Sequence, residues 1–102
     1  MNKINQESLP EDWVLIEGDF CDTFEKELAR ELPKGHVLKG ITVKALARRE
    51  SRDDFLFYID DIKFKYADVD LTWSEEKDPT WPITNLYVNY EKWIQEIEND
   101  EC

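Results

Sequence analysis

Apolar residues recur at helical spacing near both ends of this chain. The N-terminal set has one member every four residues: Phe20, Phe24, Leu28 and Leu32. This spacing puts the side chains on one face and predicts a helix from about Asp19 to Leu32. Asp19 or Asp22 is expected to cap the helix N-terminus, and Glu25 completes a capping box with Asp22. Pro33 then ends the helix.

A second helix is predicted at the C-terminal end. Its apolar face is formed by Tyr90, Trp93, Ile94 and Ile97. Before the first helix, the apolar cluster Trp13–Ile16 fits either a short strand or an earlier helical turn. Residues 1–12 are polar and are expected to form a flexible lead-in to a single domain of residues 13–102.

Between the helices, the pattern changes to that of strands. Ile41–Arg48 alternates apolar and polar residues, and Phe55–Ile59 is a continuous apolar run typical of a central strand. Lys63–Trp73 is a third extended segment, and Ile83–Val88 fits a short edge strand. The predicted fold is therefore α+β: a small antiparallel, three- to four-stranded meander sheet packed against an N-terminal and a C-terminal helix.

The alternation of residues also predicts the faces of the sheet. Val43, Ala45 and Ala47 share one parity, so a helix is expected to approach this face closely while the other face meets water. In the third strand, Phe64 and Tyr66 are out of phase with the later apolar residues. Either a β-bulge near Tyr66 resets the register, which is the favoured interpretation, or the two aromatic rings cover the second face.

The net charge of the chain limits which classes of partner it can bind. The 102 residues carry a formal net charge of -11. Residues 1–31 (nine acids, three bases) and 72–102 (eight acids, two bases) contribute -6 each, whereas residues 32–53 contribute +4 and residues 54–71 contribute -3. Phosphate groups and anionic lipids repel such a protein, so neither nucleic acid nor a membrane is expected as a partner. A basic protein is the expected partner.

Composition and cysteine usage fit a cytoplasmic protein. No apolar run approaches the roughly 20 residues of a membrane span, and the N-terminus lacks the apolar stretch of a secretory signal. Cys21, Cys102 and His36 share no spacing typical of a zinc site. Two reduced thiols are expected, with no metal and no cofactor.

Asp68 and Asp70 are the first candidate site. They share one face of the third strand, and paired carboxylates can bind a divalent cation or act as acid and base if a further ligand such as His36 converges on them. The alternative is a solvated sheet face, on which Lys44 and Arg48 form surface ion pairs with these acids, worth ~0–1 kcal/mol each. By itself, His36 is expected to be a turn or cap residue, and no catalytic residue is predicted.

The loop from Trp73 to Trp81 is the second candidate site. Tryptophans beside acids are typical of a protein-binding edge, where the rings anchor and the charges steer a basic partner. The predicted partner-binding residues are Trp73, Glu75, Glu76, Asp78, Trp81, Asp68 and Asp70. The alternative is that Trp81 folds back as a lid over the core.

A resemblance covers roughly residues 35–90. The matching residues are Lys44, Ala47, Arg48, Arg49, Asp53, Asp54, Leu71, Thr72, Trp73, Trp81 and Pro82. With them the chain resembles a family of small, largely uncharacterised bacterial proteins that have a Leu-Thr-Trp strand end and a Trp-Pro loop. That family often has a histidine where this chain has Asp70, so chemistry based on that histidine does not carry over. The resemblance implies a domain of this kind and no activity.

These observations predict a small acidic protein without catalytic machinery that acts as a protein-binding module. An inhibitor or immunity-type protein that masks a basic surface on a toxin, nuclease or other target fits this description. Two alternatives stay open: a homo-oligomeric, for example dimeric, structural or accessory unit whose sheet edge or face pairs with itself, and an enzyme or metal-binding protein that uses Asp68, Asp70 and His36.

Overall fold

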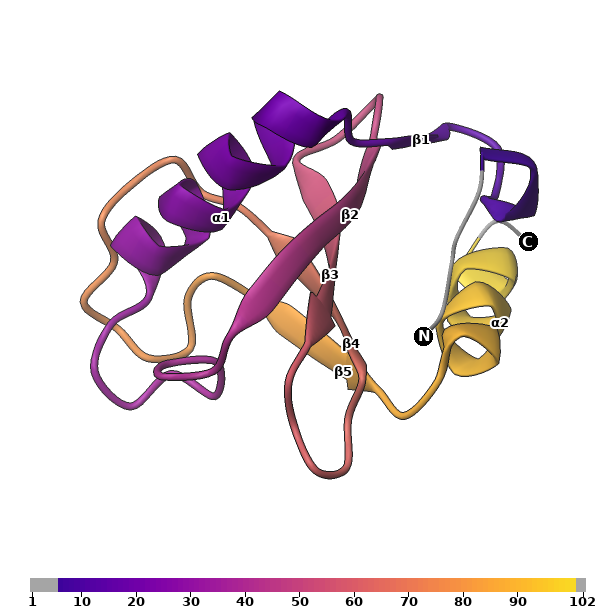
Figure 1. The fold of residues 1–102 in the computed structure, drawn as a ribbon. Helices are drawn as coiled ribbons and strands as arrows, with labels where there is room; N and C mark the ends of the chain where they lie inside the picture. The colour runs from indigo at the N-terminus through magenta and orange to yellow at the C-terminus, as the bar shows by residue number, and fades with distance from the viewer. Residues whose placement is uncertain (1–5, 101–102) are drawn as a thin grey trace.

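A five-stranded antiparallel sheet lies between two helices in the computed structural model, which describes residues 6–100 (Figure 1). The strands are β1 (Trp13–Leu15), β2 (Val43–Arg49), β3 (Asp54–Ile59), β4 (Tyr66–Asp70) and β5 (Thr84–Tyr87). The helices are α1 (Gly18–Glu31), α2 (Tyr90–Asp100) and the short 3-10 helix η1 (Gln6–Ser8). The strands follow one another in the order β1-β2-β3-β4-β5, so the predicted α+β class and meander are confirmed.

The sheet has five strands rather than the three or four expected. The additional strand is β1, which comes from the apolar cluster that fitted either a strand or a helical turn. It pairs with β2, where Trp13 lies opposite Arg49, and so it covers the edge that β2 would otherwise expose. In the expected lead-in, residues 1–5 lie outside the described residues, whereas the carbonyl of Asp12 accepts a hydrogen bond from the N–H of Glu50.

Both faces of the sheet are buried, which corrects the expectation of one wet face. Along β3, Phe55 and Phe57 pack in a cluster with Leu28 of α1, while Leu56 between them packs in a second cluster with Trp93 of α2. The two helices therefore cover opposite faces, as Figure 1 shows. The apolar run of β3 has no polar parity because this central strand meets a core on each side.

The β-bulge lies in β2, not near Tyr66 in β4. The register of β3 with β4 is continuous, whereas that of β2 with β3 shifts between Ala45 and Ala47. Ala45 therefore faces the α1 side and Ala47 the α2 side, so the expected common face of these alanines is wrong. Tyr66 covers the α2 face, as the less favoured interpretation had it, whereas Phe64 precedes β4 and packs on the α1 side.

Side chains from α1 bind the backbone at this bulge. Glu25 accepts a hydrogen bond from the N–H of Ala45 at 2.8 Å, and the thiol of Cys21 donates to the carbonyl of Ala45 at 3.4 Å. Glu25 therefore does not form the expected capping box. The helix begins one residue earlier than expected, with Glu17 as an N-cap that makes no side-chain bond. Cys21 is a free thiol, and Cys102 lies outside the described residues.

Candidate functional site

The predicted partner-binding residues lie on two sides of the sheet. Trp73 packs on the α1 side, with its ring centroid 5.9 Å from that of Phe55 and 6.3 Å from that of Phe24. Asp68 and Asp70 have the parity of Tyr66 and project on the α2 side. The structure therefore gives two surfaces to consider.

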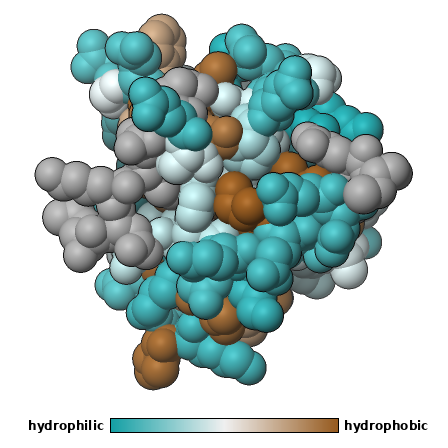
Figure 2. Space-filling model, turned by 90° about the vertical axis from the view of Figure 1, so that its right-hand side faces the viewer, coloured by the Kyte–Doolittle hydropathy of each residue, from teal (hydrophilic) through white to brown (hydrophobic). Residues whose placement is uncertain are grey.

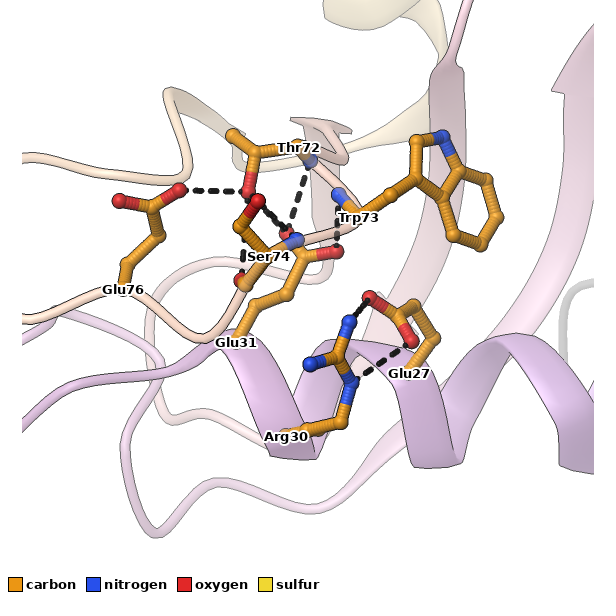
Figure 3. A network of polar contacts seen from close by, with 7 residues as sticks. All are labelled: Glu27, Arg30, Glu31, Thr72, Trp73, Ser74 and Glu76. Atoms are coloured by element: carbon orange, nitrogen blue, oxygen red, sulfur yellow. Dashed lines mark hydrogen bonds and ion pairs between the residues drawn. The ribbon is translucent and has the colours of Figure 1, made fainter.

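Glu31, at the last turn of α1, holds the start of the Trp73 loop. Its carboxylate is fully buried and accepts hydrogen bonds from the N–H of Thr72 at 2.9 Å and of Trp73 at 2.8 Å (Figure 3). Burial, with a contribution from a hydrogen bond to Glu27, raises the pKa of Glu31 to about 7. The sequence analysis missed this residue, although its position three residues after Leu28 places it on the apolar face of the helix.

The acids of the loop are used within the loop itself. Glu76 accepts a hydrogen bond from the hydroxyl of Thr72 at 2.7 Å, and Asp78 accepts from the N–H and the hydroxyl of Thr80 at 2.9 and 2.8 Å. Those two bonds lower the pKa of Asp78. Glu75 is exposed. Two of the three predicted steering acids therefore shape the loop.

Trp73 borders a shallow hollow rather than a ring of acids. The hollow, of about 260 Å³, is lined by Phe24, Arg48, Glu50, Ser51, Arg52, Asp53, Phe55 and Trp73. The side chain of Trp73 is 45% exposed, so a partner can still contact its ring. Arg52 also lines the cleft on the α2 side, so the two surfaces meet at the β2–β3 turn.

The second half of the loop is docked through Pro82 and His36. Pro82 is fully buried, whereas Trp81 is 43% exposed and does not form the lid considered as the alternative. Nδ1 of His36 accepts a hydrogen bond from the N–H of Leu38 at 3.0 Å, so Nε2 carries the proton and donates to the carbonyl of Pro82 at 2.9 Å. His36 thus joins its own turn to the loop.

We expect His36→Ala to destabilise the protein by about 1–3 kcal/mol, because the carbonyl of Pro82 and the N–H of Leu38 both lose a buried partner. Urea denaturation measures this change. The matched control is Val37→Ala, next in the chain and 59% exposed, which should stay within about 0.5 kcal/mol of the wild type. Equal stabilities of the two variants would show that the histidine does not fix the loop.

The cleft on the α2 side has mostly polar walls. It has a volume of about 170 Å³ and is lined by Arg49, Arg52, Asp54, Asp68, Asp70, Ile83, Asn85, Tyr87, Glu96 and Ile97. Four of these are carboxylates and two are arginines. Figure 2 shows the molecule from the side of α2, where hydrophilic residues cover most of the surface around small, separate apolar patches.

Asp68 forms the buried part of this cleft. It is 9% exposed, and its Oδ2 accepts a hydrogen bond from the indole N–H of Trp93 at 2.9 Å. Burial raises the pKa of Asp68 to about 7, although the bond from Trp93 acts in the opposite direction. The expected solvated sheet face is therefore wrong for Asp68, because α2 covers it.

Asp54 and Asp70 lie directly opposite each other on β3 and β4. Burial and the charge of Asp70 raise the pKa of Asp54. Like charges across a strand pair destabilise it, so this arrangement favours the approach of a cation.

The basic residues near these acids are Arg49 and Arg52 rather than the expected Lys44 and Arg48. The bulge directs Arg48 to the hollow on the α1 side and Arg49 to the cleft. Arg49 is ion-paired with Asp12 at 3.2 Å and reaches Asp54 only at 3.9 Å. Because Arg49 is shared with an acid outside the cleft, the cleft itself keeps a negative charge.

A metal site is not assembled from the predicted residues. His36 bonds Pro82 on the α1 side, whereas Asp68 lies under Trp93 on the α2 side. Within residues 6–100, no group of three or more His, Cys, Asp or Glu side chains is placed to hold a metal ion. Among the same residues, no helix has the length and apolar character needed to cross a membrane.

Comparisons with known proteins add no family: no family model matches this chain, and neither does any curated protein or solved structure. The resemblance to small bacterial proteins stays a prediction.

Proposed function

We propose that this chain is a protein-binding module that masks a basic surface of its partner, in the manner of an inhibitor or immunity-type protein. The observation that carries the proposal is the cleft on the α2 side. Its four carboxylates are Asp54, Asp68, Asp70 and Glu96. A cation that enters the cleft relieves their mutual repulsion, which two arginines offset only in part.

The size of the cleft favours a side chain over a small-molecule ligand. Pockets for small molecules usually have about 300–1,000 Å³ and mostly apolar walls, whereas this cleft has about 170 Å³ and charged walls. The end of one lysine or arginine side chain fits this description. The exposed ring of Trp73 beyond Arg52 offers an apolar anchor to the same partner.

Affinity capture from the native host tests the proposal. We expect the immobilised protein to retain a basic protein at roughly 50 mM salt and to release it at about 500 mM, since salt screens charge attraction. The variant Asp70→Asn/Glu96→Gln should lose this partner. The control Glu11→Gln/Asp60→Asn changes the net charge equally but at exposed acids outside the cleft, and it should retain the partner.

Two results would contradict the proposal. One is a partner that both double variants retain equally, which would mean that general charge and not the cleft attracts it. The other is a partner whose retention does not depend on salt.

A further inference from the structure

The outer edge of β5 is open for pairing. On its inner side, the N–H of Asp70 donates to the carbonyl of Ile83 and the N–H of Lys65 to that of Tyr87, both at 3.0 Å. Alternation along an antiparallel strand turns the backbone groups of Thr84 and Leu86 to the other side. Within residues 6–100, no backbone hydrogen bond reaches these groups of Thr84 and Leu86.

This edge lacks charges and bulges, which commonly protect an edge strand against pairing. Edge strands are commonly very short or interrupted by charges, prolines or bulges. Both edge strands are short: β1 has three residues and β5 has four, and Pro82 lies two residues before β5. The segment Ile83–Val88, however, contains no charged residue, its β5 part has a continuous register with β4, and its end residues Ile83 and Val88 are 43% and 39% exposed.

The acidic cleft lies beside this edge. Ile83, directly before β5, and Asn85 and Tyr87 of β5 line the cleft, next to Asp70 and Glu96. A strand added to β5 would lie about 4.8 Å away and would direct every second side chain to the α2 side. Long cationic side chains at those positions can reach over β5 toward the carboxylates.

Charge identifies the occupant as a basic segment rather than a second copy. A second copy would bring its own net charge of -11 and its own acidic cleft to the same edge. Lysine and arginine side chains complement Asp68, Asp70 and Glu96, while Arg49, Arg52 and Lys92 limit how many cations fit. Lys92 lies near Val88, so the cations are expected opposite Ile83 and Asn85.

We propose that β5 pairs with an extended segment of the basic partner, whose lysine or arginine residues alternate and point into the acidic cleft. This inference rests on the proposed function and assigns the mode of binding. Backbone hydrogen bonds to Thr84 and Leu86 supply affinity, and the alternating cations supply specificity.

The probe is a blocked heptapeptide in which lysine alternates with threonine. The control peptide has the same composition with its lysines consecutive, and therefore the same charge. We expect the alternating peptide to bind about tenfold more tightly and to slow amide hydrogen exchange at Thr84 and Leu86 about tenfold, with no change at Ala45, whose N–H is already bonded to Glu25. Asp70→Asn/Glu96→Gln should weaken binding about tenfold, and Glu11→Gln/Asp60→Asn should not.

Three outcomes would overturn the inference. They are equal affinity for the two peptides, unchanged exchange at Thr84 and Leu86, and protection of these amides by self-association, which sedimentation of the protein alone detects and which would assign the edge to a second copy. If the cleft variants lose a salt-sensitive basic partner while the peptide leaves the edge amides unprotected, the proposed function stands and the strand pairing falls. If no basic partner binds, both fall.

Discussion

Asp68→Asn should make the protein clearly more stable than the wild type at pH 8, with a smaller gain at pH 5. The pKa of Asp68 is about 7 in the folded protein and 3.8 in its ordinary state. Between these values the folded protein binds more protons than the unfolded chain, so the free energy of unfolding falls as the pH rises. A difference of about three pKa units corresponds to about 4 kcal/mol at most. Asparagine keeps an acceptor oxygen for Trp93 and does not ionise.

Urea denaturation at pH 5, 6, 7 and 8 measures this effect. Glu31, whose pKa is also about 7, should give the variant a remaining slope of the same sign. The carboxylates with a lowered pKa, Asp12, Asp61 and Asp78, lose their contribution only below about pH 4, outside this range. Asp60→Asn, an exposed acid outside the cleft, is the control and should follow the wild-type curve. Parallel curves for Asp68→Asn and wild type would show that the folded protein does not raise the pKa of Asp68.

Glu31→Leu should destabilise the protein by about 2–5 kcal/mol and loosen the loop that carries Trp73. The substitution leaves the N–H groups of Thr72 and Trp73 without their acceptor, and each buried unpaired donor costs about 1–3 kcal/mol. Trp73 has a φ of 61°, a conformation that a non-glycine residue adopts only when its surroundings hold it. We therefore expect faster amide exchange at Thr72 and Trp73 and the loss of ring contacts with Phe24.

Two further variants make this test specific. All variants are compared at pH 5, where the raised pKa of Glu31 costs the folded wild type little. Glu31→Gln keeps one acceptor oxygen and should cost about half as much. Asp19→Leu removes an exposed carboxylate from the first turn of the same helix and should stay within about 1 kcal/mol of the wild type. If Thr72 and Trp73 remain protected from exchange in Glu31→Leu, the carboxylate does not hold the loop.

Sequence reasoning predicted the elements whose hydrophobic pattern is visible within one short segment of the chain. The four-residue spacing around Leu28 and the apolar run of β3 identify a helix and a central strand directly. The same run already contained the evidence for two buried faces, because Leu56 is as apolar as Phe55 and Phe57. Leu46, an apolar residue in the polar phase of β2, was the corresponding sign of the bulge.

The site was harder to predict because its properties depend on residues far apart in the chain. Asp68 has the sequence context of a solvated strand residue, and only the position of Trp93, 25 residues later, shows that it is buried. The acids of the loop were identified as free charges, although Thr72 and Thr80 bind two of them. Hydrogen bonds of this kind leave no periodic pattern in the sequence.

The bulge in β2 also limits how this protein can vary. Before Leu46 the odd-numbered residues Val43 and Ala45 face α1, whereas after it the odd-numbered residues Ala47 and Arg49 face the α2 side. Deleting one residue there would turn Arg49 toward the α1 side and Arg48 toward the α2 side. The acidic cleft would then lose Arg49 and receive Arg48 from a different position along the strand. Homologous chains should therefore differ freely in the length of the β2–β3 turn but keep the length of this strand constant.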